Sequence, residues 1–388
     1  MGLESNVARA RDIMVEFADQ TGLSSTKNLP RRYLWTDAHA LCNFLSLYRC
    51  TGDEQYKHLA VTLIDKVHDS LGKHRSDDPR CGWISGLSDE EGKEHPTAGG
   101  LRIGKKLNER GHDDAFDQRL EWDRDGQYFH YLSKWMHALA RASAVTGEAG
   151  YCRWATELAK VAHASFTVSG PGGQKRLLWK MSIDLSRPLV PSSGLHDPLD
   201  AYVTYNELSE CARGIAGEHK THGLEVEIAE TTAMIEGQRW HTDDPLGLGG
   251  LLFDAGRVFQ LIAAKQLTNP DLGNILVRTA SESLASFDSH ALQHQPAEYR
   301  LAFRELGLSI GLHAVARMQA VARSNPDLFG QGLQQGLENL RQYVPLAAII
   351  EKFWAAPGNQ EVATWLDHFD INRVMLATSL LPDEFLTV

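Results

Sequence analysis

The amino-acid sequence predicts an all-α protein in which two kinds of helix alternate along the chain. Helices of the first kind are apolar on one face, as surface helices are, and helices of the second kind are apolar on nearly every side, which indicates burial. An internal repeat carries the same pattern, because residues 51–70 align without a gap with residues 146–165. The only stretch with a strand-like pattern is 176–190.

The two kinds of helix occur six times each. One-sided helices are expected at about 4–19, 53–73, 148–168, 220–236, 270–289 and 326–353. Helices that are apolar all round are expected at about 36–50, 127–146, 200–217, 247–267, 298–323 and 361–380. Six buried and six surface helices in alternation favour a closed ring of helical hairpins, an (α/α)6 toroid, as a single domain over residues 1–388.

Glycines in the segment 246–256 are expected where the backbones of inner helices approach one another closely. An open helical solenoid and half of a terpene-cyclase double barrel are the alternative folds. A solenoid would lack the buried inner ring, so the toroid is preferred.

The predicted arrangement resembles the six-hairpin sugar-enzyme superfamily, which includes the unsaturated glucuronyl hydrolases and the N-acylglucosamine 2-epimerases. The resemblance extends over nearly the whole chain in the number and length of the helices. It is a resemblance of architecture, and it implies an enzyme that acts on carbohydrate.

The composition is that of an ordinary globular protein, with 43% hydrophobic and 23% charged residues among 388. A net charge of −11 and a pI near 5.9 disfavour sequence-independent binding to nucleic acid or to an anionic membrane. No apolar run approaches the roughly 18 residues of a membrane span, and the N-terminus lacks the pattern of a secretory signal. We therefore expect a cytoplasmic protein without nucleic-acid or membrane partners, and leave a homo-oligomer open.

The five cysteines are odd in number, widely spaced and free of any CxxC pair. This pattern argues against a disulfide framework and against a zinc–thiolate site. Glycine-rich nucleotide loops, a GxSxG elbow and an HExxH helix do not occur in the sequence. We expect neither a metal nor a cofactor.

Chemistry is expected where the inner helices begin, because in such a ring their N-termini and the preceding loops line one rim. An acidic residue at a helix start is explained by capping alone in about half of cases, but polar and aromatic residues at these starts are denser than caps require. The predicted catalytic residues are Asp37, Asp125, His196, Asp200, His368 and Asp370. The predicted substrate contacts at or within the inner helices are Trp35, His39, Tyr128, His130, Tyr202, Arg300 and His313.

Two other features are interpreted as structural. An Asp-Pro-Leu sequence at 197–199 recurs at 244–246, where Asp as N-cap and Pro at the next position make a good helix start. His68 and His163 occupy equivalent positions on outer helices, where a satisfied structural histidine is the simpler interpretation.

The segment 75–125 is too long for a simple connection and is predicted to be a lid over the mouth of the ring. Trp83 is expected to anchor it by burial. Arg102, Lys105 and Lys106 form a basic cluster in an acidic protein, which is either a solvated surface run or a clamp for an anionic substrate, with Arg102 and Lys105 as the substrate contacts.

The preferred function is a glycoside hydrolase that acts on a small oligosaccharide, possibly an anionic one, since carboxylates at several helix starts can supply the acid and the base that glycoside cleavage requires. The first alternative is a sugar 2-epimerase or isomerase, for which His313 and His368 are the histidines of first interest. A terpenoid cyclase or a non-catalytic binding protein is the second alternative, and no DDxxD or DxDD motif supports a cyclase.

Overall fold

The structure, a computed structural model, describes residues 2–24, 31–170, 172–215, 223–267 and 269–388. The chain divides into two compact units. Unit 1 comprises Met1–Phe17, Arg49–Gly52 and Gly237–Val388, and unit 2 comprises Ala18–Tyr48 and Asp53–Glu236. The single domain expected from the sequence stays a prediction.

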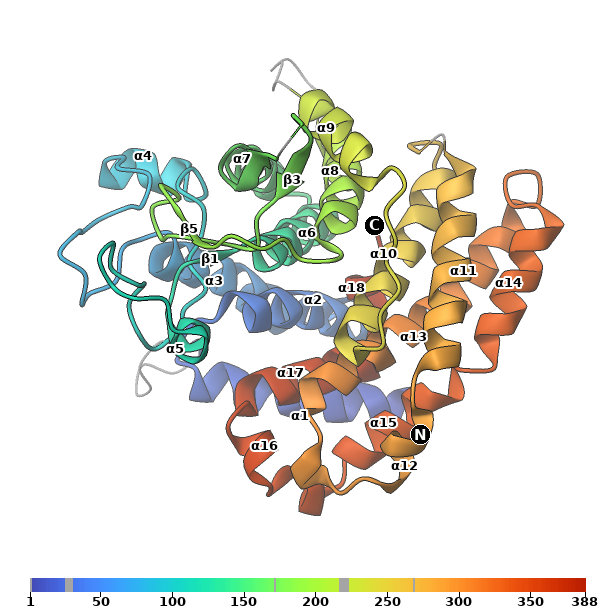
Figure 1. The fold of residues 1–388 in the computed structure, drawn as a ribbon. Coiled ribbons are helices and arrows are strands. Elements are labelled where there is room, and N and C mark those ends of the chain that lie inside the picture. Colours follow the sequence, from blue (N-terminus) through green and yellow to red (C-terminus); the bar gives the residue numbers. More distant parts are fainter. Residues whose placement is uncertain (1, 25–30, 171, 216–222, 268) are drawn as a thin grey trace. The chain divides into compact units, whose positions relative to one another are not determined.

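Helices dominate both units (Figure 1). Unit 2 contains most of α2 (Leu34–Thr51), then α3 (Glu54–Leu71), α4 (Asp89–Glu94), α5 (Gln118–Asp123), α6 (Phe129–Thr146), α7 (Ala149–Phe166), α8 (Asp197–Ile215) and α9 (Glu225–Ile235). Unit 1 contains most of α1 (Leu3–Gln20), then α10 (Pro245–Ala263), α11 (Pro270–Ser286), α12 (Ser289–His294), α13 (Ala302–Ser324), α14 (Gln331–Arg341), α15 (Pro345–Trp354), α16 (Ala363–Leu366), α17 (Phe369–Leu380) and α18 (Asp383–Leu386).

Short strands lie in unit 2 between these helices. They are β1 (Gln127–Tyr128), β2 (Thr167–Ser169), β3 (Lys175–Leu177), β4 (Lys180–Met181) and β5 (Pro188–Val190). β1, β4 and β5 form a three-stranded antiparallel sheet in that order, and β2 pairs with β3. The strand pattern predicted over 176–190 is therefore confirmed.

The alternation of buried and one-sided helices is confirmed in both units. In α2 every residue from Leu34 to Leu47 is buried, and in α17 every residue from Asn372 to Leu380 is buried. In α3, by contrast, burial is confined to one stripe that includes Tyr56, as expected of an outer helix.

Three predicted helices differ in their bounds. The segment 326–353 forms two helices, because Pro345 lacks the N–H of a helix interior and instead begins α15. The segment 361–380 likewise divides into α16 and α17. The outer helix predicted at 220–236 begins at Glu225, and residues 220–222 lie outside the described residues.

By length and hydropathy α10 is apolar enough to cross a membrane, but 72% of the relevant window is buried inside the protein. This burial is what a core helix shows.

The cysteines require a correction, because the structure pairs Cys152 of α7 with Cys211 of α8 as a disulfide, with their Cα atoms 6.2 Å apart. The packing of α7 against α8 brings together two residues that are 59 positions apart, which sequence spacing could not indicate.

The closest backbone contact in the predicted glycine segment is between α10 and α13. A Cβ atom on Gly249 would overlap the Gly307 carbonyl oxygen, and one on Gly311 would lie 2.5 Å from the Gly249 carbonyl oxygen. These distances are far below van der Waals contact, so only glycine fits at either position. The expected close approach of inner helices is confirmed.

We predict that Gly249→Ala destabilises the protein by at least about 1–3 kcal/mol, because the new methyl group must push two helix backbones apart. The matched control is Gly250→Ala, the next residue on the same helix, where nothing lies within 4 Å of the added Cβ. That variant should be neutral or more stable by up to about 1 kcal/mol, owing to the higher helix propensity of alanine. Urea unfolding of both variants tests this; equal stability of the two would contradict the contact.

The repeated histidines on the outer helices have satisfied partners, as the sequence suggested. His68 Nε2 accepts a hydrogen bond of 3.1 Å from the Trp135 indole, and His163 Nε2 lies 2.8 Å from a Glu230 oxygen. Burial lowers the pKa of His68 from 6.5 to about 3. The hydrogen bond from the Trp135 indole also requires a neutral His68 ring, because a protonated Nε2 could not accept it.

The His68 pair predicts acid sensitivity. A histidine whose pKa is lower in the folded than in the unfolded state contributes stability above about pH 6.5, and this contribution is lost as the pH falls towards 3, by up to about 1.4 kcal/mol per pH unit. His68→Gln keeps an acceptor for Trp135 but cannot titrate. Chemical unfolding at pH 7 and pH 5 should show a smaller loss for this variant than for the wild type, and an identical pH dependence would refute the assignment.

Candidate active site

The predicted catalytic carboxylates of unit 2 are each held by a cation. Asp37 lies 3.1 Å from Arg32 and accepts a hydrogen bond of 2.9 Å from the Tyr33 N–H, so it holds the start of α2. Asp200 lies 2.8 Å from Lys134 and accepts a bond from Ser133. His196 precedes α8, and its carbonyl accepts the Asp200 N–H.

Asp125 is the centre of a larger charged network. Its carboxylate lies 2.8 Å from Arg102 and 3.3 Å from Arg75, and it accepts a hydrogen bond of 2.9 Å from the Gly104 N–H. The side chain is fully buried. Like Asp37 and Asp200, it is a charge-balanced group that joins segments of unit 2.

The predicted aromatic and histidine contacts of the first two helix starts do lie together. The Trp35 ring is 5.2 Å from that of His39 and 5.9 Å from that of His130, and Tyr128 stacks on His130 at 5.5 Å. Burial lowers the pKa of both His39 and His130 to about 3. Both rings are therefore neutral at pH 7 and poorly matched to proton transfer near neutrality. Tyr202 of α8 is also buried, which raises the pKa of its phenol.

The predicted contacts of unit 1 are dispersed. Arg300 binds Glu305 through two hydrogen bonds, and Asp370 accepts a bond of 2.7 Å from Arg373. His313 lies 2.6 Å from Glu351, whereas the exposed His368 packs its ring against Phe303. Because His313 lies ten residues further along α13 than Phe303, about 15 Å of helix separates the two histidines, and they do not form a pair.

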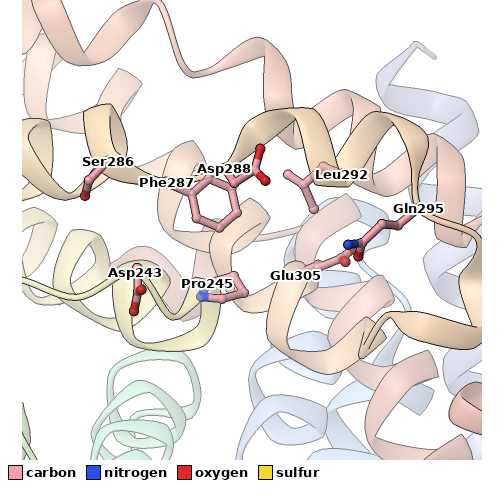
Figure 2. A pocket seen from close by; sticks show the side chains of 8 residues that line it. All are labelled: Asp243, Pro245, Ser286, Phe287, Asp288, Leu292, Gln295 and Glu305. Atoms are coloured by element: carbon pink, nitrogen blue, oxygen red, sulfur yellow. The ribbon is translucent and has the colours of Figure 1, made fainter.

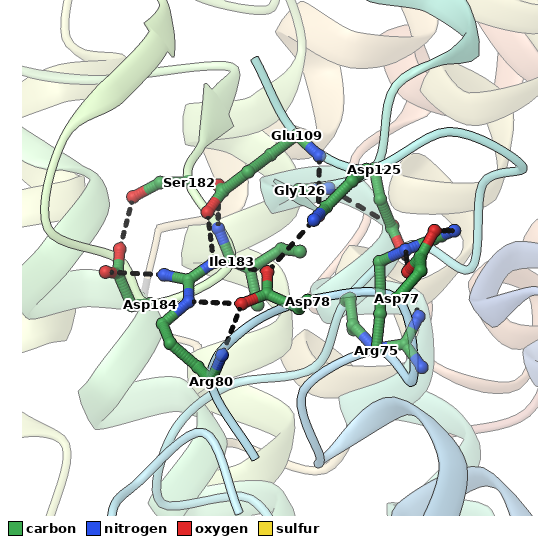
Figure 3. A network of polar contacts seen from close by, with 12 residues as sticks. Arg75, Asp77, Asp78, Arg80, Glu109, Asp125, Gly126, Ser182, Ile183 and Asp184 are labelled. Atoms are coloured by element: carbon green, nitrogen blue, oxygen red, sulfur yellow. Dashed lines mark hydrogen bonds and ion pairs between the residues drawn. The ribbon is translucent and has the colours of Figure 1, made fainter. Parts of the chain in front are cut away.

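The segment 75–125 is fixed to the rest of unit 2 by ion pairs (Figure 3). Arg80 binds Asp78 at 2.8 Å, Glu109 at 2.5 Å and Asp184 at 2.9 Å, so it ties two parts of the segment to the turn before β5. The hydrogen bond from Arg80 is the main cause that holds the pKa of Asp78 well below its usual range. Trp83 is buried, as predicted, with Lys73 above its ring.

The basic cluster of this segment differs from the expected anion clamp. Arg102 is buried, and besides Asp125 it donates to the backbone carbonyls of Ser70 and Lys73. Burial lowers the pKa of Lys105, whose ammonium group lies 5.4 Å from the centre of the Tyr33 ring. Of the three cations only Lys106 is exposed. Arg102 thus joins backbone segments, and its guanidinium is already saturated with protein acceptors.

We therefore predict that Arg102→Ala lowers the free energy of unfolding by about 3 kcal/mol, because it leaves the buried Asp125 with one cation fewer. Lys106→Ala is the control from the same cluster and should change stability by less than about 0.5 kcal/mol. Denaturant unfolding curves provide the measurement. Wild-type stability of Arg102→Ala would restore the view that this side chain is available to a ligand.

A cavity of about 270 Å³ lies in unit 1 at the start of two inner helices, α10 and α13 (Figure 2). Figure 2 shows three carboxylates around it, those of Asp243, Asp288 and Glu305. The remaining lining residues are Pro245, Ser286, Phe287, Leu292 and Gln295. Apolar surface with a few convergent polar groups is the usual make-up of a small-molecule site.

The loop before α10 is pinned in place by its neighbours. The Thr242 N–H donates to the Ser283 hydroxyl at 3.3 Å, and the His241 ring lies 3.1 Å from the Ser286 hydroxyl. Asp244 is the N-cap of α10, since its carboxylate accepts the Gly247 N–H at 2.9 Å. Of the two consecutive aspartates, Asp243 and Asp244, only Asp244 is used for capping.

Asp243, the first aspartate of the pair, is exposed at the cavity. Its carboxylate has no ion-pair partner within the described ranges. Glu305 differs, because Arg300 binds both of its oxygens, at 2.9 and 2.6 Å, and the Trp354 indole donates a third bond of 2.7 Å. The cavity thus combines an exposed carboxylate with one that protein donors hold in place.

The sequence indicated part of this site. The sequence identifies the start of α10 as an inner-helix start and explains Asp244 as its N-cap, but Asp243 was not singled out. The signal that could have identified Asp243 is the doublet itself, because an N-cap requires one carboxylate and two are present. Asp288 and Glu305 gave no comparable signal. The common cavity expected for Asp37, Asp125, His196, Asp200, His368 and Asp370 stays a prediction.

Comparison with solved structures shows which fold this is. A family 76 glycoside hydrolase from a bovine Bacteroides thetaiotaomicron strain superposes with a TM-score of 0.56 at 11% identity, over 99% of this chain and 78% of that one. An inactive variant of the α-1,6-mannanase of Salegentibacter sp. HEL1_6, in complex with α-1,6-mannotriose, gives a TM-score of 0.53 at 12% identity over 98% and 99% of the chains. A D-mannose isomerase gives 0.51 at 10% identity over 98% and 97%.

No protein-family model matches the sequence, and comparison with curated proteins returns no similar sequence. The similarity is therefore one of fold. The solved structures are (α/α)6-toroid sugar enzymes, so the predicted fold class, an (α/α)6 toroid, is confirmed.

Proposed function

We propose that the chain is a glycoside hydrolase that cleaves a small, neutral oligosaccharide in the cavity between the starts of α10 and α13. The observation that carries the proposal is the set of three carboxylates that line this cavity, those of Asp243, Asp288 and Glu305. Glycoside cleavage requires an acid that protonates the leaving oxygen and a second carboxylate that acts as base or nucleophile. The cavity supplies both, with one carboxylate to spare.

The surroundings assign a role to each carboxylate. Asp243 and Asp288 are exposed at the cavity and are proposed as the acid–base pair. Glu305 is held in position by two hydrogen bonds from Arg300 and one from the Trp354 indole, so it is proposed to shape the wall of the cavity rather than to take part in proton transfer.

The charge of the cavity favours a neutral substrate. Three carboxylates would repel a uronic acid or a sugar phosphate, and the arginines at the start of α13 are already paired, Arg300 with Glu305 and Arg304 with Asp244. In the basic cluster of the segment 75–125, which suggested an anionic sugar, Arg102 is bound to Asp125 and to two backbone carbonyls. A neutral oligosaccharide avoids both difficulties.

The solved structures supply a first substrate to test. The α-1,6-mannanase of similar fold binds α-1,6-mannotriose in a variant inactivated by two Asp-to-Asn changes. This chain has an acidic cavity lined by Asp243 and Asp288, so a neutral mannose oligosaccharide is a reasonable starting point. Epimerisation is the alternative reaction, and the similarity to a D-mannose isomerase supports including free mannose among the substrates.

The proposal predicts that Asp243→Asn lowers kcat/KM for a cleaved oligosaccharide by at least about 100-fold, the usual contribution of a general acid or base. The control is Asp327→Asn, which removes an exposed carboxylate from a loop of the same unit, away from the cavity lining, and should leave the rate unchanged. Chromatography of products from α-1,6-mannotriose and related neutral oligosaccharides measures cleavage directly. Full activity of Asp243→Asn, or conversion of mannose without any cleavage, would overturn the hydrolase assignment.

A further inference from the structure

Unit 2 contains a second, smaller pocket that the proposed reaction does not use. Its volume is about 140 Å³, and it lies between α5, β1, the β3–β4 connection and β5. Aromatic rings dominate its wall, with three polar side chains among them. The lining residues are Phe116, Gln118, Glu121, Trp122, Tyr128, Trp179, Val190 and Ser192.

Two of these rings are exposed to an unusual degree. The exposed fraction is 48% for Trp122 and 55% for Phe116, and the two side chains flank the first turn of α5. A single exposed aromatic residue needs no explanation, but two that line one pocket form an apolar patch of the kind that marks a ligand site. The fold gains nothing from leaving them in water.

The floor of the pocket is rigid. Trp179 stacks in parallel on Tyr128, with ring centres 5.2 Å apart and planes inclined by 3°, and Trp122 meets Trp179 edge to face at 5.0 Å. The backbone of Trp179 is held on both sides, because its N–H donates to Ser192 and its carbonyl accepts the Phe129 N–H. Such a platform is preorganised, so binding costs little conformational entropy.

Both cations beside the pocket are already paired with a buried carboxylate. Glu121 is buried and lies 2.9 Å from Lys180 and 3.2 Å from Arg110. Both cations are thereby used by a protein carboxylate, and an anionic ligand would find neither of them available. The pocket therefore selects for a neutral ligand with a flat apolar face and a polar edge.

We propose that this pocket binds one neutral pyranose ring, by stacking of its C–H face on Trp122, with the edge of the ring against Trp179, and hydrogen bonding of its hydroxyls to Gln118 and Ser192. A sugar ring has the required combination, since its axial C–H groups form an apolar face and its hydroxyls lie around the edge. The volume suits a single ring, being well below the roughly 300 Å³ at which drug-sized ligands are accommodated. The pocket belongs to unit 2, so it is a binding site distinct from the carboxylate cavity of unit 1.

The test is whether methyl α-D-mannopyranoside and α-1,6-mannotriose bind to the full chain. Calorimetry measures the affinity, and NMR of the isotope-labelled protein monitors the indole N–H resonances. Trp122→Ala should weaken binding at this site at least 10-fold. Leu120→Ala is the matched control, because Leu120 is an exposed apolar residue of the same helix that does not line the pocket. It should bind as the wild type does.

The experiments distinguish failure of the proposed sugar-binding pocket from failure of the proposed hydrolase activity. If the pocket binds sugar, Asp243→Asn retains the response of the Trp122 indole even though it cannot cleave the substrate, and Trp122→Ala retains cleavage of a small substrate. Wild-type affinity of Trp122→Ala, equal losses in Leu120→Ala, or no shift of the Trp122 and Trp179 indole resonances with any neutral pyranoside would overturn the binding site. Tighter binding of glucuronate than of the neutral sugars would do the same.

Discussion

The contact between α10 and α13 is the constraint on which the proposed active site depends. Gly249, Gly307 and Gly311 allow the two helix backbones to touch, and any larger residue at Gly249 would separate them. Because Asp243 stands just before α10 and Glu305 lies in the first turn of α13, the spacing of these helices sets the width of the carboxylate cavity between their starts. The glycines thus act on chemistry through packing, several residues away from any substrate.

Charge balance separates Asp243 from the acids at the helix starts of unit 2. In unit 2 the acids at the helix starts are neutralised in place, Asp37 by Arg32, Asp125 by Arg102 and Asp200 by Lys134. Each of these pairs is desolvated, so removal of one partner would leave a buried charge that is costly to maintain. Asp243 is instead exposed at a cavity and has no ion-pair partner within the described ranges.

The sequence predicted the structure best where apolar residues recur at a regular helical spacing. Helix type, helix order and the glycine contact follow from apolar periodicity, and the structure bears them out from α1 to α17 with shifts of a few residues at most positions. The break at Pro345 was missed because the flanking helices α14 and α15 share the same apolar pattern. Local pattern specifies local structure well.

The partners of individual side chains could not be predicted from the sequence pattern. Nothing in the sequence around Arg102 shows that Asp125, Ser70 and Lys73 would saturate its guanidinium, since these partners meet it only in the folded chain. The rings of Trp35 and His130 lie together, but Trp35 is buried and His130 half-buried, and this packing against several helices makes them part of the core rather than an open platform for a sugar. Candidate acids could therefore be found from sequence, whereas the distinction between paired and exposed acids required coordinates.

The most direct test of the central claim is a crystal structure of Asp243→Asn grown with α-1,6-mannotriose. The variant should bind the sugar without cleaving it, so that the ligand persists in the crystal. We expect a sugar ring in the cavity between α10 and α13, with its glycosidic oxygen within hydrogen-bonding distance of residue 243 and with Asp288 on the same ring. An empty carboxylate cavity in a crystal whose sugar lies elsewhere on the protein would contradict the account.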